Sequence, residues 1–184
     1  GDNADFTPES NDIPWSFVPE RKVTVEDVKY ILSSYYQGTP YNPYAKAEDP
    51  RKGIYRPIGI NRTGVMAICQ IRNGVPEKAK GIEWICFGST SFNTVLPVYT
   101  QVPRLPKYLT DVTEDVSTDN FYWNSRLINA LTDAHYGTAI VHVERYQAAV
   151  VSKARALLRE YDGRLAETED DTLLERANEA PTNL

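Results

Sequence analysis

The sequence predicts an α+β fold. Apolar residues recur at helical spacing near the N-terminus and again after residue 118, whereas β-rich segments separated by turn residues fill the middle. The 184 residues suit one domain, since domains usually have roughly 100–200 residues. We therefore expect a single domain 1–184 in which antiparallel hairpin strands lie between helices. Its expected parts are an irregular lead-in over 1–22, an ordered core over 23–163 and an acidic marginal helix or tail over 164–184.

The first twenty residues cannot sustain a helix, because they contain three prolines among five acidic side chains. We expect this segment to lie on a surface through its two large anchors, Trp15 and Phe17. The first helix is expected over 24–37, because Thr24 can act as its N-cap with Asp27 three positions on. Gly38 then ends the pattern.

The segment GTPYNPYAKAEDPRKG (38–53) predicts a long ordered loop, and such loops are often functional. Three strands follow in the sequence. The first, Val65–Ile71, is apolar on both faces, so we expect it to be covered on both sides. The second covers 81–88, in a hairpin register that places Cys69 opposite Trp84. The third lies within 92–102, where Pro97 indicates an edge or a bulge.

Two helices are expected after the strands. Thr118 or Asp119 can cap the first, which ends near Tyr136. The second runs from about 138 to 161 and ends at Gly163. Its candidate buried stripe consists of Ile140, Val143, Ala154, Leu157 and Leu158. The acidic tail should form a marginal helix that frays before Pro181.

Composition excludes several classes of function. The net charge of −5 gives no basic field for polyphosphate, so we expect no nucleic-acid partner. No apolar run is long enough to span a membrane, so no membrane partner is expected. Two cysteines and two histidines are too few for a convincing zinc site. We expect no metal and no cofactor, two free thiols and a reducing compartment.

No side chain stands out as a nucleophile. Cys69 and Cys86 lie within apolar strand patterns, where cysteine is usually a small buried hydrophobe. His135 and His142 form no recognisable pairing with a cysteine or serine, so ordinary surface or core roles are expected for them. The common nucleotide-binding, serine-hydrolase and zinc-protease motifs are absent from the sequence.

A polar set does stand out within β-rich sequence: Arg56, Asn61, Arg62 and Thr63, followed by Asn93 and Thr94. Guanidinium and amide groups are costly to bury without partners. Two interpretations remain open from the residues alone. The arginines pair with loop acids such as Glu48 or Asp49, or the set presents donors to an anionic or amide-bearing ligand.

Several long segments resemble one known family. They are GTPYNPYAKAEDPRKGIYRPIGINRT with CQIR, then WICFGSTSFNTVLPVYTQV, and later VSTDNFYWNSRLINAL. Over roughly Val23 to Val151 they resemble, in the same order, the C-terminal half of the bacterial dipeptidases of peptidase family C69. The match of several motifs in order is far more specific than one short pattern.

This resemblance implies an N-terminal-nucleophile hydrolase with two stacked sheets between helical layers (αββα). In that family a cysteine at the mature N-terminus attacks the substrate, forms an acyl-enzyme and uses its own α-amine as the base. The sequence begins Gly1, Asp2, Asn3, so we expect a fragment that lacks the nucleophile and is inactive alone. The resemblance further implies a dipeptide substrate and a cytoplasmic location.

Site residues follow from the resemblance as well. Arg62, then Arg56, together with Asn61, would support catalysis by holding the nucleophile and the oxyanion. Asn93 and Thr94 would line the same pocket, and Tyr41, Asn42 and Tyr44 would close over a dipeptide. Two alternatives stay open: an amidase for other N-acyl substrates, similar to bile-salt or penicillin amidases, and a non-catalytic peptide-binding or interaction module. Because half a scaffold exposes apolar strand surface, we also expect self-association, with a homodimer as the expected form.

Overall fold

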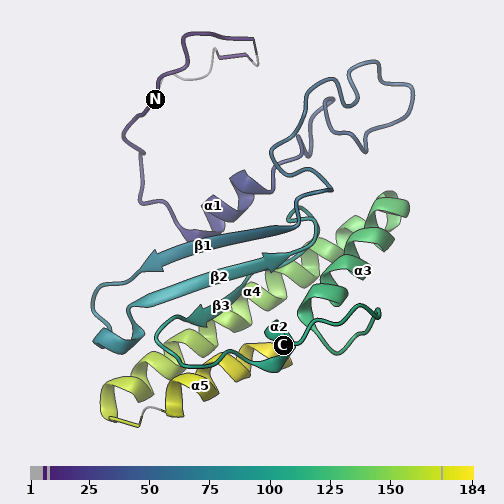
Figure 1. The fold of residues 1–184 in the computed structure, drawn as a ribbon. Coiled ribbons are helices and arrows are strands. Elements are labelled where there is room, and N and C mark those ends of the chain that lie inside the picture. The colour runs from purple at the N-terminus through teal and green to yellow at the C-terminus, as the bar shows by residue number, and fades with distance from the viewer. Residues whose placement is uncertain (1–5, 8, 171) are drawn as a thin grey trace.

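Three hairpin-connected strands form the centre of the molecule, as predicted (Figure 1). The computed structural model describes residues 6–7, 9–170 and 172–184. Helix α1 (Val25–Leu32) precedes the strands β1 (Val65–Ile71), β2 (Gly81–Phe87) and β3 (Leu96–Tyr99). Then follow α2 (Lys107–Thr110), α3 (Phe121–Ala134), α4 (Tyr136–Glu167) and α5 (Thr172–Glu179). Short 3-10 turns occupy Glu77–Ala79 and Ala180–Asn183.

The strands pair antiparallel in the order β1-β2-β3, which leaves β3, with Pro97, at one edge as expected. The predicted hairpin register was wrong by one residue, because Cys69 pairs with Glu83 and Cys86 with Met66. Side chains alternate between the two faces of a strand, so this shift places the cysteines on opposite faces. Both thiols are free, as predicted.

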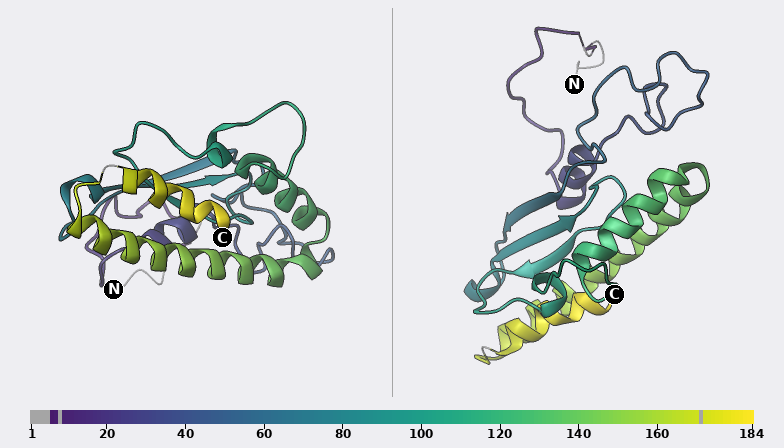
Figure 2. Two further views of the ribbon diagram at one scale, coloured as in Figure 1. Left: turned by 90° about the horizontal axis from the view of Figure 1, so that it is seen from below. Right: turned by 45° about the vertical axis from the view of Figure 1, so that its right-hand side comes forward.

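Most of the core lies on one face of the sheet. Met66, Ile68, Ile82, Trp84 and Cys86 are buried there, and they pack with α1, α4 and α5. The opposite face of β3 presents Leu96 and Val98 to α2, α3 and α4. The views in Figure 2 show that α4 runs alongside the sheet and that α5 folds back next to it. The structure therefore contains the predicted mixture of helices and antiparallel strands.

The prediction that β1 is covered on both sides was wrong. Val65 and Ile71 are 59% and 86% exposed, and Ala67 and Cys69 are exposed as well. Only the residues on the other face, such as Ile68, are buried. Because β1 has apolar side chains on both faces, its sequence predicted that both faces are covered. The described residues cover only one of them.

The described part of the lead-in has no helix or strand, and its two predicted aromatic anchors are not buried. Trp15 is fully exposed and Phe17 is 69% exposed, and Figure 1 shows this arm extending away from the sheet. Their predicted role as anchors is therefore wrong within the described residues. The prediction that the chain lacks the nucleophile rests on Gly1, Asp2 and Asn3, which lie outside the described residues.

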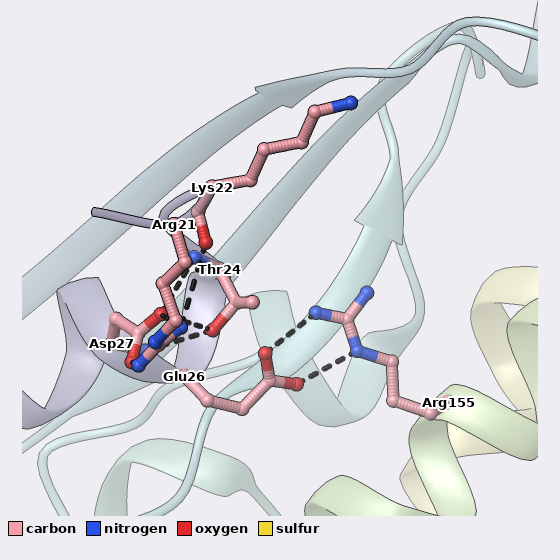
Figure 3. A network of polar contacts seen from close by, with 6 residues as sticks. All are labelled: Arg21, Lys22, Thr24, Glu26, Asp27 and Arg155. Carbon is pink, nitrogen blue, oxygen red and sulfur yellow. Dashed lines mark hydrogen bonds and ion pairs between the residues drawn. The ribbon is translucent and has the colours of Figure 1, made fainter. Parts of the chain in front are cut away.

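Helix α1 begins as predicted. Thr24 Oγ1 accepts a hydrogen bond from Asp27 N (3.1 Å), and the Asp27 carboxylate accepts one from Thr24 N (2.9 Å). The helix ends at Leu32 rather than at residue 37, since the chain turns where Tyr36 adopts a positive φ of 61°. Figure 3 shows how Glu26 then accepts two hydrogen bonds, of 2.8 and 2.9 Å, from the Arg155 guanidinium of α4.

The helices after the sheet start and end differently from the prediction. The N-cap of α3 is Asn120, whose Oδ1 accepts a hydrogen bond from Trp123 N (2.8 Å), and not Thr118 or Asp119. Gly163 lies inside α4, which continues to Glu167. The buried stripe of α4 includes Val143, Ala154 and Leu158 as predicted, and adds Val150 and Leu165. Packing of Leu165 in the core offsets the roughly 1 kcal/mol cost of a helical glycine.

The acidic tail is better packed than a marginal helix would be. Leu173, Leu174 and Ala177 of α5 are buried in the main core. The Asn178 side chain completes the edge of β3, because its Oδ1 accepts from Tyr99 N (2.7 Å) and its Nδ2 donates to Tyr99 O (3.0 Å). The ordered core therefore extends beyond residue 163.

Candidate functional site

The predicted site residues lie mostly in two loops, one between α1 and β1 and one between β2 and β3. Three residues fasten these loops together: Ser91 Oγ lies 2.9 Å from the carbonyl oxygens of both Ser33 and Gly59. Gly59 N donates to Ser34 O (2.7 Å). A Cβ at Gly59 would lie 2.4 Å from the Ser33 carbonyl, so only glycine fits there. These hydrogen bonds hold in place the loop that carries Arg56 and Arg62.

Gly59 and Ser91 also line a cavity of about 300 Å³, which we call the arginine cavity. The loop before β1 contributes Arg56, Asn61 and Arg62, which the prediction placed in a strand context. Asn61 and Arg62 lie in a turn instead, and Arg56 lies in irregular backbone. The remaining lining residues include Tyr35, Tyr44, Ser89 and Phe92. The structure therefore brings four predicted site residues together, namely Tyr44, Arg56, Asn61 and Arg62.

Within the part of the chain that the structure describes, the two guanidinium groups of this cavity have no acidic partner. Among the described residues, neither Arg56 nor Arg62 forms an ion pair, and both are exposed. Asp49, one proposed partner, instead binds Arg51 at 3.1 Å. Of the two interpretations of the sequence, this geometry favours donors that face an anionic or amide-bearing ligand.

Aromatic rings form the opposite wall of the cavity. Tyr44 packs edge-on against Phe92, with ring centroids 5.5 Å apart, and stacks on Tyr136 at 4.4 Å. Burial, followed by hydrogen bonding to Tyr136, raises the pKa of Tyr35, and burial with a hydrogen bond to Asp133 raises the pKa of Tyr44. Both phenols therefore keep their protons near neutral pH and do not act as bases.

Sequence reasoning missed Ser89, which lines the arginine cavity. Its side chain is fully buried, and Ser89 Oγ has no hydrogen-bond partner among the described residues. A buried hydroxyl without a partner is unfavourable unless a ligand or water completes it. The run Gly88, Ser89, Thr90, Ser91 directly after an apolar strand was the sequence signal that could have identified it.

The other predicted residues have different positions. Asn42 is buried, and its Oδ1 accepts from Tyr44 N (2.8 Å), so it supports the aromatic wall from behind. Tyr41 packs on Tyr55 at 4.9 Å and does not line the cavity. Asn93 is buried and donates to Ser89 O and Ser125 O (3.0 Å each). Thr94 lines a second cavity, which shares Tyr35 and Ser91 with the first.

Cys86 does not lie in an environment that activates a thiol. Burial raises the pKa of Cys86 to about 12, although the charge of Lys29 opposes this, and so the thiol stays protonated. Cys69 is exposed on the open face of β1, which corrects the prediction that it is a buried hydrophobe. His135 and His142 are both exposed, on either side of the start of α4.

Two kinds of feature are absent from the described part of the chain. Histidine, cysteine, aspartate and glutamate side chains do not gather there in groups of three or more that could hold a metal ion. None of the helices in that part has both the length and the apolar character needed to cross a membrane.

Comparison with known proteins gives a consistent match. The model of peptidase family C69 matches residues 2–149. A dipeptidase of Bifidobacterium longum is 45% identical over 167 residues, which is 90% of this chain and 31% of that protein. A probable dipeptidase A of Streptococcus pyogenes is 46% identical over 159 residues, covering 86% and 34%. A probable dipeptidase B of Lactococcus lactis is 34% identical over 179 residues, covering 96% and 38%. The chain thus spans about a third of the length of these relatives.

Proposed function

The chain belongs to peptidase family C69, and we propose that it forms the substrate-binding wall of a dipeptidase. In this proposal the arginine cavity receives the dipeptide. The observation that carries it is that Arg56 and Arg62 form no ion pair among the described residues. Both line the same cavity as Ser89, whose buried hydroxyl has no hydrogen-bond partner there. Such donors suit a peptide, because it carries a carboxylate and a carbonyl oxygen that becomes anionic during hydrolysis.

We assign the donors of the cavity as follows. Arg62, with Asn61 beside it in sequence, donates to the oxyanion of the tetrahedral intermediate, and Arg56 binds the terminal carboxylate. Tyr44 and Phe92 contact the side chain of the substrate, since their rings form the apolar wall. Asn42 positions Tyr44 through the hydrogen bond to its backbone N–H.

The nucleophile in this proposal is a cysteine outside the 184 residues, which forms the acyl-enzyme. Two observations support this. The buried, protonated Cys86 is a poor nucleophile, and the matched relatives have about two thirds of their length outside the matched region. We further propose that the complete protein has the stacked-sheet architecture of N-terminal-nucleophile hydrolases, in which a second sheet covers the open face of β1.

Release of amino acids from a panel of dipeptides tests the proposal. The full-length polypeptide that contains this segment should hydrolyse dipeptides, whereas the purified 184-residue chain should release no amino acids. N-acyl amino acids and bile-salt amides in the same panel separate a dipeptidase from a related amidase. Turnover by the 184-residue chain that disappears in Cys69→Ala or Cys86→Ala would contradict the location of the nucleophile.

A further inference from the structure

The second cavity, which the proposed function does not use, lies between α1 and α4 and has a volume of about 350 Å³. We call it the lysine cavity, because Lys29 of α1 lines it together with Glu144 of α4. Its apolar wall consists of Val95, Ile140, Ala148 and Val151. This volume is within the range of roughly 300–1,000 Å³ that is typical of small-molecule sites.

Two opposite charges in the lysine cavity have no salt-bridge partner among the residues that the structure describes. Within the described part of the chain, neither Lys29 nor Glu144 takes part in a salt bridge, so the two groups are not joined to each other. Glu26 also lines the cavity, but its carboxylate is occupied by the two hydrogen bonds from Arg155. One cationic and one anionic group therefore remain available to a ligand.

Burial makes this arrangement costly for Lys29. The side chain is half-buried, and burial lowers its pKa, because removal from water disfavours the charged form. A further polar group lines the same cavity: Thr94 is 1% exposed, and its Oγ1 has no hydrogen-bond partner among the described residues. Lys29 would be stabilised by a ligand that supplies an anion.

The pair of free charges restricts the class of ligand. A simple anion would compensate Lys29 but would be repelled by Glu144, and a simple cation would have the reverse effect. A ligand that carries both an ammonium and a carboxylate group compensates both side chains, and an apolar side chain on it fits the wall formed by Ile140 and Val151. Free α-amino acids and dipeptides share this chemistry.

We propose that the lysine cavity is a binding site for a zwitterionic amino acid or dipeptide with an apolar side chain, separate from the arginine cavity. Lys29 binds the carboxylate of the ligand, and Glu144 binds its ammonium group. The site is defined by binding alone, so it does not depend on whether the arginine cavity supports hydrolysis.

Calorimetric titration of the 184-residue chain tests this proposal with four probes. L-Leucine and L-leucyl-glycine carry both charges, with a wider separation between them in the dipeptide. N-Acetyl-leucine lacks the ammonium group, and leucine amide lacks the carboxylate. We expect one of the first two to bind and each of the last two to bind at least about tenfold more weakly, since a charge-assisted hydrogen bond is lost. The tighter of the first two identifies the ligand.

Variants locate the binding. Lys29→Met and Glu144→Gln should each weaken binding of the preferred probe by about tenfold or more, and neither removes a contact that the fold needs. Lys153→Met and Glu175→Gln are matched controls on exposed positions of α4 and α5, and they should bind as the unchanged chain does.

Three results would overturn the proposal. The first is that the two singly charged analogues bind as tightly as the preferred zwitterion, and the second is unchanged binding in Lys29→Met and Glu144→Gln. The third is no binding of either zwitterion at high millimolar concentrations. Loss of binding in Arg56→Gln alone would assign the ligand to the arginine cavity and would likewise contradict the proposed site.

Discussion

At the scale of single residues, Gly59 links the loop before β1 to the rest of the molecule. Its backbone N–H donates to Ser34, and its carbonyl oxygen lies 2.9 Å from Ser91 Oγ. Arg56 and Arg62 lie three residues before and after this glycine in the sequence. The position of Gly59 therefore constrains the backbone from which both arginine side chains extend. The site therefore depends on a residue that has no side chain.

We predict that Gly59→Ala lowers the free energy of unfolding by about 2 kcal/mol, since overpacking usually costs 1–3 kcal/mol. The new Cβ would lie 2.4 Å from the Ser33 carbonyl and 2.6 Å from Ser91 Oγ. Urea denaturation followed by circular dichroism measures the change. Gly64→Ala is the matched control, because nothing lies within 4 Å of a Cβ there. Equal stability of the two variants would contradict the described packing.

Residue types predicted which polar residues lie near one another better than they predicted the surroundings of those residues. Arg56, Asn61 and Arg62 stood out because polar groups in apolar sequence require partners, and they do share a cavity. Trp15 was expected to find a surface, but aromatic character alone does not identify that surface. Ser89 was missed because a buried hydroxyl becomes informative only when its missing partner is seen.

At the scale of elements, α1 is held to α4 by one bidentate ion pair. The Arg155 guanidinium binds Glu26 and also lies 4.5 Å above the centre of the Trp84 ring. Hydrogen bonding to Arg155 lowers the pKa of Glu26 in the folded chain. The lysine cavity lies between these same two helices, so this contact also maintains the spacing across it.

The lowered pKa of Glu26 predicts a pH dependence. A carboxyl group whose pKa is lower when folded contributes its stability above its unfolded pKa of about 4.3 and loses it as the pH falls through the folded value. Between pH 6 and pH 3 the unchanged chain should therefore lose more stability than Glu26→Gln, which cannot titrate there. Urea midpoints across this range measure the difference. Parallel curves for the two proteins would contradict the role of the pair.

The start of α1 was easier to predict than the end of α4. The Thr24 and Asp27 box is a local pattern, and the structure has it as predicted. By contrast, Gly163 marks a helix end only when packing does not override its low helix propensity, and burial of Leu165 does override it. The tail looked marginal because the contact of Asn178 with Tyr99 is distant in sequence.

At the scale of the whole molecule, one open face remains on β1. Val65, Ala67, Cys69 and Ile71 project from it, and β1 lies at an edge of the three-stranded sheet. Exposed apolar edge strands tend to pair with another chain. The apolar pattern predicted that this face needs a cover, but it carries no information on which segment provides one.

We propose that the isolated 184-residue chain self-associates through β1, whose outer edge and open face are both exposed. Ile71→Lys should shift the chain from dimer to monomer in sedimentation velocity, because an edge lysine opposes strand pairing. Ile71 is 86% exposed, so this variant should fold normally. Lys153→Met on exposed α4 is a control that should not change the association. A clean monomer of the unchanged chain at high concentration would contradict this proposal.

The central claim is that the arginine cavity receives the dipeptide. Its most direct test is kcat/KM for dipeptide hydrolysis by the full-length polypeptide with Arg62→Gln and Arg56→Gln, compared with the exposed control Arg104→Gln. We predict a decrease of about 100-fold or more for Arg62→Gln, as expected when an oxyanion donor is removed, a smaller decrease for Arg56→Gln and no change for the control. Unchanged kcat/KM in both cavity variants would contradict the claim.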